Sequence, residues 1–221
     1  MYIWVILATF LAILASYTLA PRADYRQLAI EPQAEATLSK IVTKHQAARD
    51  YVRFRKKPYT ANPSIVEYAP GIISDTELEG YAYFGHEISD EFVSQVFCMN
   101  EDMTVSYSDS SACSVRKNKK MVATYGPIPL RWRNMGADGE QPNEDLMNAL
   151  RNTVDGGTFF GYTVKAFHPD SIRNVSGSDM QIVDRDRDDI FVPKAIVNDT
   201  NFKKACDLSK GYSCLVYLSG I

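Results

Sequence analysis

The chain has 221 residues, of which 45% are hydrophobic and 23% are charged, and its formal net charge is −3. This length and composition support a folded domain with a sizeable apolar core. Because nucleic-acid binding usually leaves a strongly basic footprint, the slightly acidic balance argues against a nucleic-acid partner.

Residues 1–20 predict a transmembrane anchor, since they contain no charged side chain. A helix rises about 1.5 Å per residue, so about 20 residues cross a hydrocarbon core of about 30 Å. Trp4 and Tyr17 lie near the two ends, where aromatic rings prefer the membrane boundary. No basic residue precedes the apolar run, so a retained anchor is favoured over a cleaved secretion signal, which stays open as the alternative.

Small residues in the anchor predict a surface for membrane-helix packing. Ala8, Ala12 and Ala15 stand at i, i+4 and i+7, with Ser16 beside them. They would share one helical face and let another membrane helix approach closely. The alternative is that small residues are common in any membrane span.

Residues 21–58 predict an amphipathic helical stem that continues the anchor. Apolar residues recur at helical spacing, and acidic residues precede basic ones, which matches the helix dipole. Pro21 and Pro32 predict kinks, because a proline removes one hydrogen bond without ending a helix that is packed on both sides. His45 is expected on or beside the packed face.

Residues 65–221 change to the pattern of a β-rich head. Short alternating or apolar runs predict antiparallel strands. The expected strands are Ile65–Tyr68, Gly80–Phe84, Val93–Met99, Met103–Tyr107, Lys120–Tyr125, Thr158–Phe167, Gln181–Val183, Ile190–Val197 and Ser213–Leu218. The predicted fold class is therefore α+β: a long, kinked, membrane-anchored N-terminal helix followed by an antiparallel β-rich head with one short helix.

That short helix is predicted after Asn143, a good N-cap residue. Leu146, Leu150 and Val154 follow at helical spacing, and Gly156–Gly157 should end the helix. The preceding loop, 134–142, is rich in glycine and polar residues and is a candidate boundary between two halves of the head.

Four cysteines follow the anchor: Cys98, Cys113, Cys206 and Cys214. They permit three disulfide connectivities, and pairing within the two local pairs needs the least assumption. Two disulfides would require an oxidising compartment such as the bacterial periplasm. Reduced cysteines and a zinc site remain alternatives, although the chain has no C-x-x-C spacing.

Two arginines next to the anchor, Arg22 and Arg26, would instead place the head in the cytoplasm by the positive-inside rule. We give the cysteines more weight than this short charge signal. The expected location is the bacterial inner membrane, crossed once, with the head in the periplasm, or outside the cell if it joins a filament.

The sequence carries no recognisable catalytic or cofactor motif, and we expect no enzyme activity, cofactor or metal. His45, His86 and His168 have no paired ligand spacing, and neither a G-x-S-x-G elbow nor a phosphate-binding loop occurs. The segment 184–189 begins like a calcium loop but lacks its glycine and its final glutamate. A charged hairpin tip is therefore favoured there.

Several of these features resemble type IV pilins and their minor-pilin relatives. Pro21 and Pro32 look like the kinks of a pilin stem, and Cys206 with Cys214 looks like the pair that closes the C-terminal loop.

The first half of the chain also resembles small PilM-type proteins of the thin, type IVb pilus systems on conjugative plasmids. The similar segments are Met1–Trp4 and the region 47–62, which ends in Tyr59-Thr60-Ala61-Asn62 before Pro63. The resemblance implies a role in pilus biogenesis. Its partners would be other pilus or secretion-machine proteins and membrane lipid. Association with further copies of the same chain, as a homo-oligomer, is also a candidate.

A second hypothesis is a secreted or membrane-tethered ligand-binding domain, such as an adhesin. It would place exposed aromatic side chains along a groove, with Tyr81, Tyr83, Trp132 and Tyr162 as candidates. A third, an exported hydrolase, would need Asp75, Glu77 and Glu79 to converge.

Overall fold

The computed structural model describes residues 23–54, 69–83, 86–136, 139–153, 159–165, 180–184, 189–206 and 213–220. Several expectations lie outside these ranges: the anchor 1–20 with its four small residues, the strand Ile65–Tyr68, His168 and the tip 185–188. None of the helices in the described ranges is long and apolar enough to cross a membrane.

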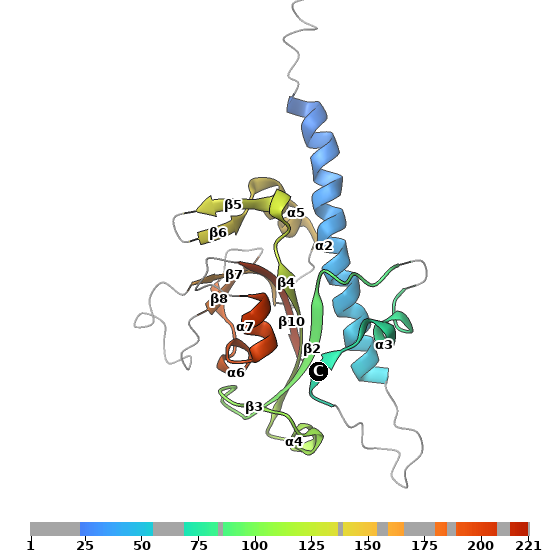
Figure 1. The fold of residues 1–221 in the computed structure, drawn as a ribbon, viewed down its shortest axis with the longest axis vertical. Helices are drawn as coiled ribbons and strands as arrows, with labels where there is room; N and C mark the ends of the chain where they lie inside the picture. The colour runs from blue at the N-terminus through green and yellow to red at the C-terminus, as the bar shows by residue number, and fades with distance from the viewer. Residues whose placement is uncertain are drawn as a thin grey trace, which may run out of the picture.

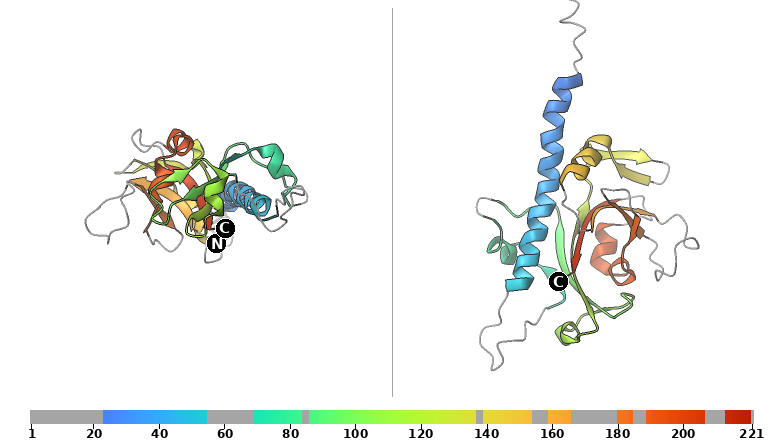
Figure 2. Two further views of the ribbon diagram at one scale, coloured as in Figure 1. Left: turned by 90° about the horizontal axis from the view of Figure 1, so that it is seen from below. Right: turned by 180° about the vertical axis from the view of Figure 1, so that it is seen from behind.

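Helix α2, Ala23–Phe54, is a rod of 32 residues whose first turns extend beyond the head (Figure 1). It passes through Pro32 without interruption, as expected of the predicted stem. Its buried face begins with Ala34, Leu38 and Ile41, all fully buried. The helix therefore belongs to the core of the head over most of its length, and only its N-terminal part stands clear of it (Figure 2).

The head is built on one antiparallel sheet, which confirms the α+β class. Seven strands follow the spatial order β1-β2-β4-β10-β7-β8-β9, and β3 pairs with β2 beside this path. Their bounds are β1 Gly71–Ile73, β2 Val93–Met99, β3 Ser106–Tyr107, β4 Lys119–Pro127, β7 Phe159–Lys165, β8 Met180–Asp184, β9 Asp189–Phe191 and β10 Cys214–Gly220.

The C-terminal strand β10 lies in the middle of this sheet. It pairs with β4 from Cys214↔Pro127 to Gly220↔Met121, and with β7 from Leu215↔Tyr162 to Leu218↔Phe159. Its side chains alternate between the two faces, as the period of a strand requires. Leu215 and Tyr217 enter the core on one face, and Val216 and Leu218 enter the core on the other.

Helices cover both faces of the sheet (Figure 1). On one face α2 packs with α3, Asp75–Glu79, and α5, Glu144–Thr153. On the other face lie α6, Lys194–Val197, and α7, Thr200–Ala205. A further short helix, α4, Ser110–Ser114, lies near the end of β2. The head thus has three layers, with the sheet in the centre.

One expected strand is wrong, and another is right only in its first residues. Gly80–Phe84 was expected to be extended, but residues 80–82 form a turn after α3. Ile190–Val197 divides into strand β9 and helix α6, because Pro193 stands at the start of α6 and cannot donate a hydrogen bond to a sheet. The expected strand Met103–Tyr107 is reduced to β3.

The loop 134–142 is a β-hairpin, formed by β5, Arg133–Gly136, and β6, Gly139–Pro142. Strands that precede it and strands that follow it belong to the same sheet. The head also contains more helices than the single one expected. The expected one, α5, does begin after Asn143, whose Oδ1 accepts a hydrogen bond from Leu146 N at 3.0 Å.

Candidate functional site

Two adjacent residues of α2 attach this helix to the head through polar contacts. His45 is fully buried against the sheet, where Nδ1 lies 3.0 Å from Thr124 Oγ1 and Nε2 lies 2.9 Å from Ser219 Oγ. Its ring stacks on Tyr217 with the centroids 3.9 Å apart. Burial, and then the nearby Arg49, lower the pKa of His45 from 6.5 to about 3, so the imidazole is neutral.

Lys44 points toward α3 and the loop before β2. Its ammonium contacts Asp75 Oδ1 at 2.5 Å, Ser89 O at 2.7 Å and Phe92 O at 2.5 Å. The lysine side chain is 1% exposed, whereas the Asp75 carboxylate is 42% exposed. Three oxygen partners match the three donors of an ammonium group, so the buried charge is fully paired. These contacts identify Lys44 and His45 as structural residues.

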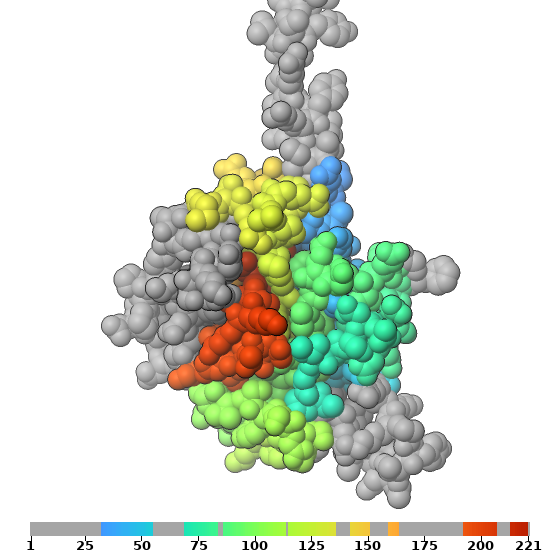
Figure 3. Space-filling view, viewed as in Figure 1, coloured from blue at the N-terminus to red at the C-terminus, as the bar shows by residue number. Residues whose placement is uncertain are grey.

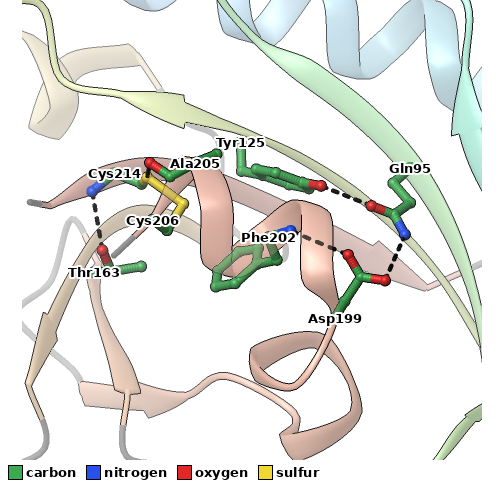
Figure 4. The surroundings of a disulfide bond; sticks show 8 residues. All are labelled: Gln95, Tyr125, Thr163, Asp199, Phe202, Ala205, Cys206 and Cys214. Carbon is green, nitrogen blue, oxygen red and sulfur yellow. Dashed lines mark hydrogen bonds between the residues drawn. A yellow bond between two sulfur atoms is a disulfide. The ribbon is translucent and has the colours of Figure 1, made fainter. Parts of the chain in front are cut away.

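The two disulfides pair Cys98 with Cys113 and Cys206 with Cys214, as the local-pairing hypothesis expects. The first joins β2 to α4, and the second joins the end of α7 to the start of β10 (Figure 4). Cys214 N also donates to Thr163 Oγ1 at 3.0 Å, which links β10 to β7. Two disulfides are compatible with a periplasmic or secreted domain.

An open groove of about 510 Å³ lies where three distant segments of the chain meet. Its walls come from the start of β1, from the segment 104–108 and from the α6–α7 connection, and its floor is β2. The three wall segments meet on the face shown in Figure 3. The lining residues are Pro70, Gly71, Gln95, Val96, Thr104, Val105, Ser106, Tyr107, Ser108, Ala195, Asn198, Asp199, Thr200 and Asn201.

A hydrogen-bonded chain of Tyr125, Gln95 and Asp199 supports the floor of the groove (Figure 4). Tyr125 OH donates to Gln95 Oε1 at 2.7 Å, and Gln95 Nε2 donates to Asp199 Oδ2 at 3.1 Å. Burial, and then the Asp199 charge, raise the pKa of Tyr125 above its usual range, so its hydroxyl stays protonated and donates. The same carboxylate caps α7 by accepting from Asn201 N and Phe202 N.

The start of the wall at 104–108 is held by a second cluster of hydrogen bonds, which involves the turn before it. Asn100 Oδ1 accepts from Thr104 N at 2.8 Å and from Val105 N at 3.0 Å, and its Nδ2 donates to Thr104 Oγ1 at 2.8 Å. The backbone angle φ of Met103 is 55°, which is unusual for a residue other than glycine. Met103 O accepts from Ala195 N at 3.0 Å, so this wall is joined to the opposite one.

The aromatic residues proposed as a binding surface do not line this groove or form one exposed surface. Trp132 and Tyr162 are 4% and 8% exposed and belong to the core between α2 and the sheet. Trp132 points inward because its Nε1 donates to Thr37 Oγ1 of α2 at 3.1 Å. Tyr81 packs edge-on to Tyr51 of α2, with the centroids 5.4 Å apart. Only Tyr83, at 61%, is well exposed among these four.

Two of the three acidic residues considered for a hydrolase, Asp75 and Glu77, have structural partners, and no interaction brings Glu79 to them within the described residues. Asp75 pairs with Lys44, and Glu77 completes the capping box of α3 with Ser74 and accepts from Tyr51 OH at 2.7 Å. Within the described part of the chain, His, Cys, Asp and Glu form no group of three or more that could hold a metal ion. The groove residues come from positions that no sequence motif connects, and sequence reasoning missed them.

Comparison with known proteins gives no match, whether with protein-family models, curated proteins or solved structures.

Proposed function

We propose that this chain is a non-enzymatic assembly component of a type IVb pilus or a related secretion machine. Residues 1–20 hold it in the bacterial inner membrane, and the disulfide-bonded head faces the periplasm. Its partners are other proteins of the machine, and the stem and anchor contact neighbouring membrane helices through Ala8, Ala12, Ala15 and Ser16.

The observation that carries the proposal is the position of α2. The apolar segment 1–20 precedes by two residues a helix whose later turns are buried in the head and whose first turns extend away from it (Figure 2). A helix that packs along the head in this way would couple the folded head to a membrane segment placed just before it. The two disulfides support an oxidising location for that head.

Deletion of the gene in its host tests the role. We expect few or no pili by electron microscopy and a loss of plasmid transfer, with both restored by the intact gene supplied in trans. A copy that lacks residues 1–20 but carries a cleavable secretion signal is the matched control, and it should not restore piliation. Normal piliation in the deletion strain would exclude the role.

Fractionation tests the proposed location separately. After extraction with alkaline carbonate the full chain should stay with the membranes, and protease added from the periplasmic side should degrade the head. A head that is protected in spheroplasts and degraded only after lysis would contradict the orientation.

A second candidate function is a membrane-tethered ligand-binding domain. The groove between β1, the segment 104–108 and the α6–α7 connection favours it, because about 510 Å³ is within the usual range for ligand sites.

A further inference from the structure

The floor of the groove carries a buried amide that is only partly satisfied. Gln95 is 4% exposed, and its orientation follows from its partners. A carboxylate only accepts hydrogen bonds, so the atom facing Asp199 Oδ2 must be the amide nitrogen. This nitrogen has two N–H donors, of which one is used. Within the described part of the chain, the second N–H of Gln95 has no acceptor, and leaving it unpaired is costly.

The Asp199 carboxylate next to it has room for one more donor. Its three hydrogen bonds come from Asn201 N at 2.9 Å, Phe202 N at 3.0 Å and Gln95 Nε2 at 3.1 Å. A carboxylate offers about four acceptor positions. The floor therefore presents an available donor and an available acceptor on neighbouring atoms that are 3.1 Å apart.

A single hydroxyl group fits this pair of atoms. A hydroxyl can accept from Gln95 Nε2 and donate to Asp199 Oδ2 through the same oxygen. A backbone carbonyl could take only the first bond and a backbone N–H only the second. A peptide would therefore need a suitable polar side chain at this point, whereas a sugar offers a hydroxyl group on most of its carbon atoms.

The remaining lining suits a polar ligand that carries no negative charge. Asp199 is the one charged residue among the lining residues, and three N–H donors stabilise its charge without cancelling it. The rim adds hydroxyl and amide side chains: Thr104, Ser106, Tyr107, Ser108, Asn198, Thr200 and Asn201. Tyr107, 37% exposed, also offers part of an aromatic ring for apolar C–H groups.

The walls are held in place without a ligand. Asn100 fixes one wall, the Ala195–Met103 hydrogen bond joins it to α6, and Asp199 fixes the start of α7. Binding would therefore require little ordering of the groove, which reduces its entropic cost.

We propose that this groove binds a neutral sugar chain, with one sugar hydroxyl bridging Gln95 and Asp199. The proposal names the ligand class for the second candidate function and does not depend on the pilus role. The groove is open to solvent, so a chain can continue beyond it.

Titration calorimetry on the full chain tests the proposal, in a detergent without a sugar head group. The probes are cellotetraose, chitotetraose, maltotetraose and mannotetraose, each tested up to about 10 mM. At least one should bind saturably with a Kd of about 1 mM or tighter. Gln95→Met keeps the side-chain volume and removes the amide, and Asp199→Asn keeps an N-capping residue. Each should weaken binding at least tenfold.

Two variants at exposed positions outside the groove serve as matched controls: Gln33→Met and Asp90→Asn, which should bind like the parent chain. Near-UV circular dichroism verifies that all four variants are folded. The proposal is overturned if none of the four sugars binds, or if Gln95→Met and Asp199→Asn bind as tightly as the controls. If no sugar binds but tetralysine does, and Asp199→Asn loses that binding, the groove is a peptide site and the sugar assignment fails while a ligand-binding function survives.

Discussion

Lys44 Nζ and Asp75 Oδ1 lie 2.5 Å apart where α2 contacts α3, and the lysine is buried while the aspartate is partly in solvent. Four residues earlier on the same helix, Lys40 pairs with Glu91 at 2.8 Å, with both side chains 46% exposed. The two ion pairs connect the same helix to the same side of the head but differ in burial.

Lys44→Met should therefore be much more damaging than Lys40→Met. Removing the Lys44 ammonium leaves Ser89 O and Phe92 O without their donor, and we expect a loss of about 3 kcal/mol in the free energy of unfolding. Lys40→Met breaks only a solvent-exposed pair and should cost about 0–1 kcal/mol. Urea denaturation of both variants measures the difference, and equal losses would contradict the structural role of Lys44.

His45 should make the head less stable in mild acid. The unfolded chain protonates this histidine below its ordinary pKa of 6.5, whereas the folded chain resists protonation down to about pH 3. Between these values the unfolded state binds more protons, so stability falls as the pH falls, by up to about 1.4 kcal/mol per pH unit.

His45→Gln isolates this effect, because glutamine keeps a hydrogen-bonding side chain but does not titrate. We expect the stability advantage of the parent chain over the variant to shrink by about 2 kcal/mol between pH 6 and pH 4.5. Urea denaturation at several pH values gives the comparison. His86→Gln, at an exposed position, is the control and should show no such change. Parallel stability profiles for the parent chain and His45→Gln would refute the assignment.

Each disulfide should contribute to stability mainly by restricting the unfolded chain. The bonds close loops with sequence separations of 15 and 8 residues. Chain-entropy arguments then predict losses of about 3 kcal/mol for either paired Cys→Ala variant, slightly more for the longer loop. Urea denaturation with and without a reducing agent tests this: the reductant should destabilise the parent chain and leave a variant lacking all four cysteines unchanged.

Gly126 should tolerate no side chain, because a methyl group there would meet the Glu91 carbonyl and the Phe92 ring, both at 2.7 Å. We expect Gly126→Ala to cost about 1–3 kcal/mol through overpacking. Gly80 is the matched control, since a methyl group there meets nothing within 4 Å and its φ of −68° suits alanine. Thermal unfolding should show a lower Tm for Gly126→Ala alone.

The parts of the fold that were predictable are those with a strong local pattern. The bounds predicted for the strand Val93–Met99 are those of β2, because its apolar side chains serve the cores on both faces of the sheet. Asn143 predicts the start of α5 in the same way, as an N-cap residue. Helix α3 was missed although Ser74 and Glu77 form a readable capping box, and α7 was missed although Asp199 is a good N-cap. The propensities of short helices are too weak to compete with strand-like composition.

The groove could not be predicted from local patterns. Its floor comes from Gln95 and Val96, and its walls come from positions near 70, 106 and 199. These segments meet because β1 and β3 both pair with β2, and because α7 packs on the face of the sheet that carries Phe97. The burial of two aromatic candidates, Trp132 and Tyr162, has a related reason. Both side chains are amphipathic, and no local pattern indicates whether the polar tip meets solvent or, as for Trp132 and Thr37, a group on another helix.

Strand β10 fills the place between β4 and β7, so these two strands share a neighbour that is distant from both in sequence. Until β10 has docked, each of them exposes one edge of unpaired backbone. A partly folded head without β10 in place would present these open edges to other proteins, so docking of this strand protects the head from aggregation.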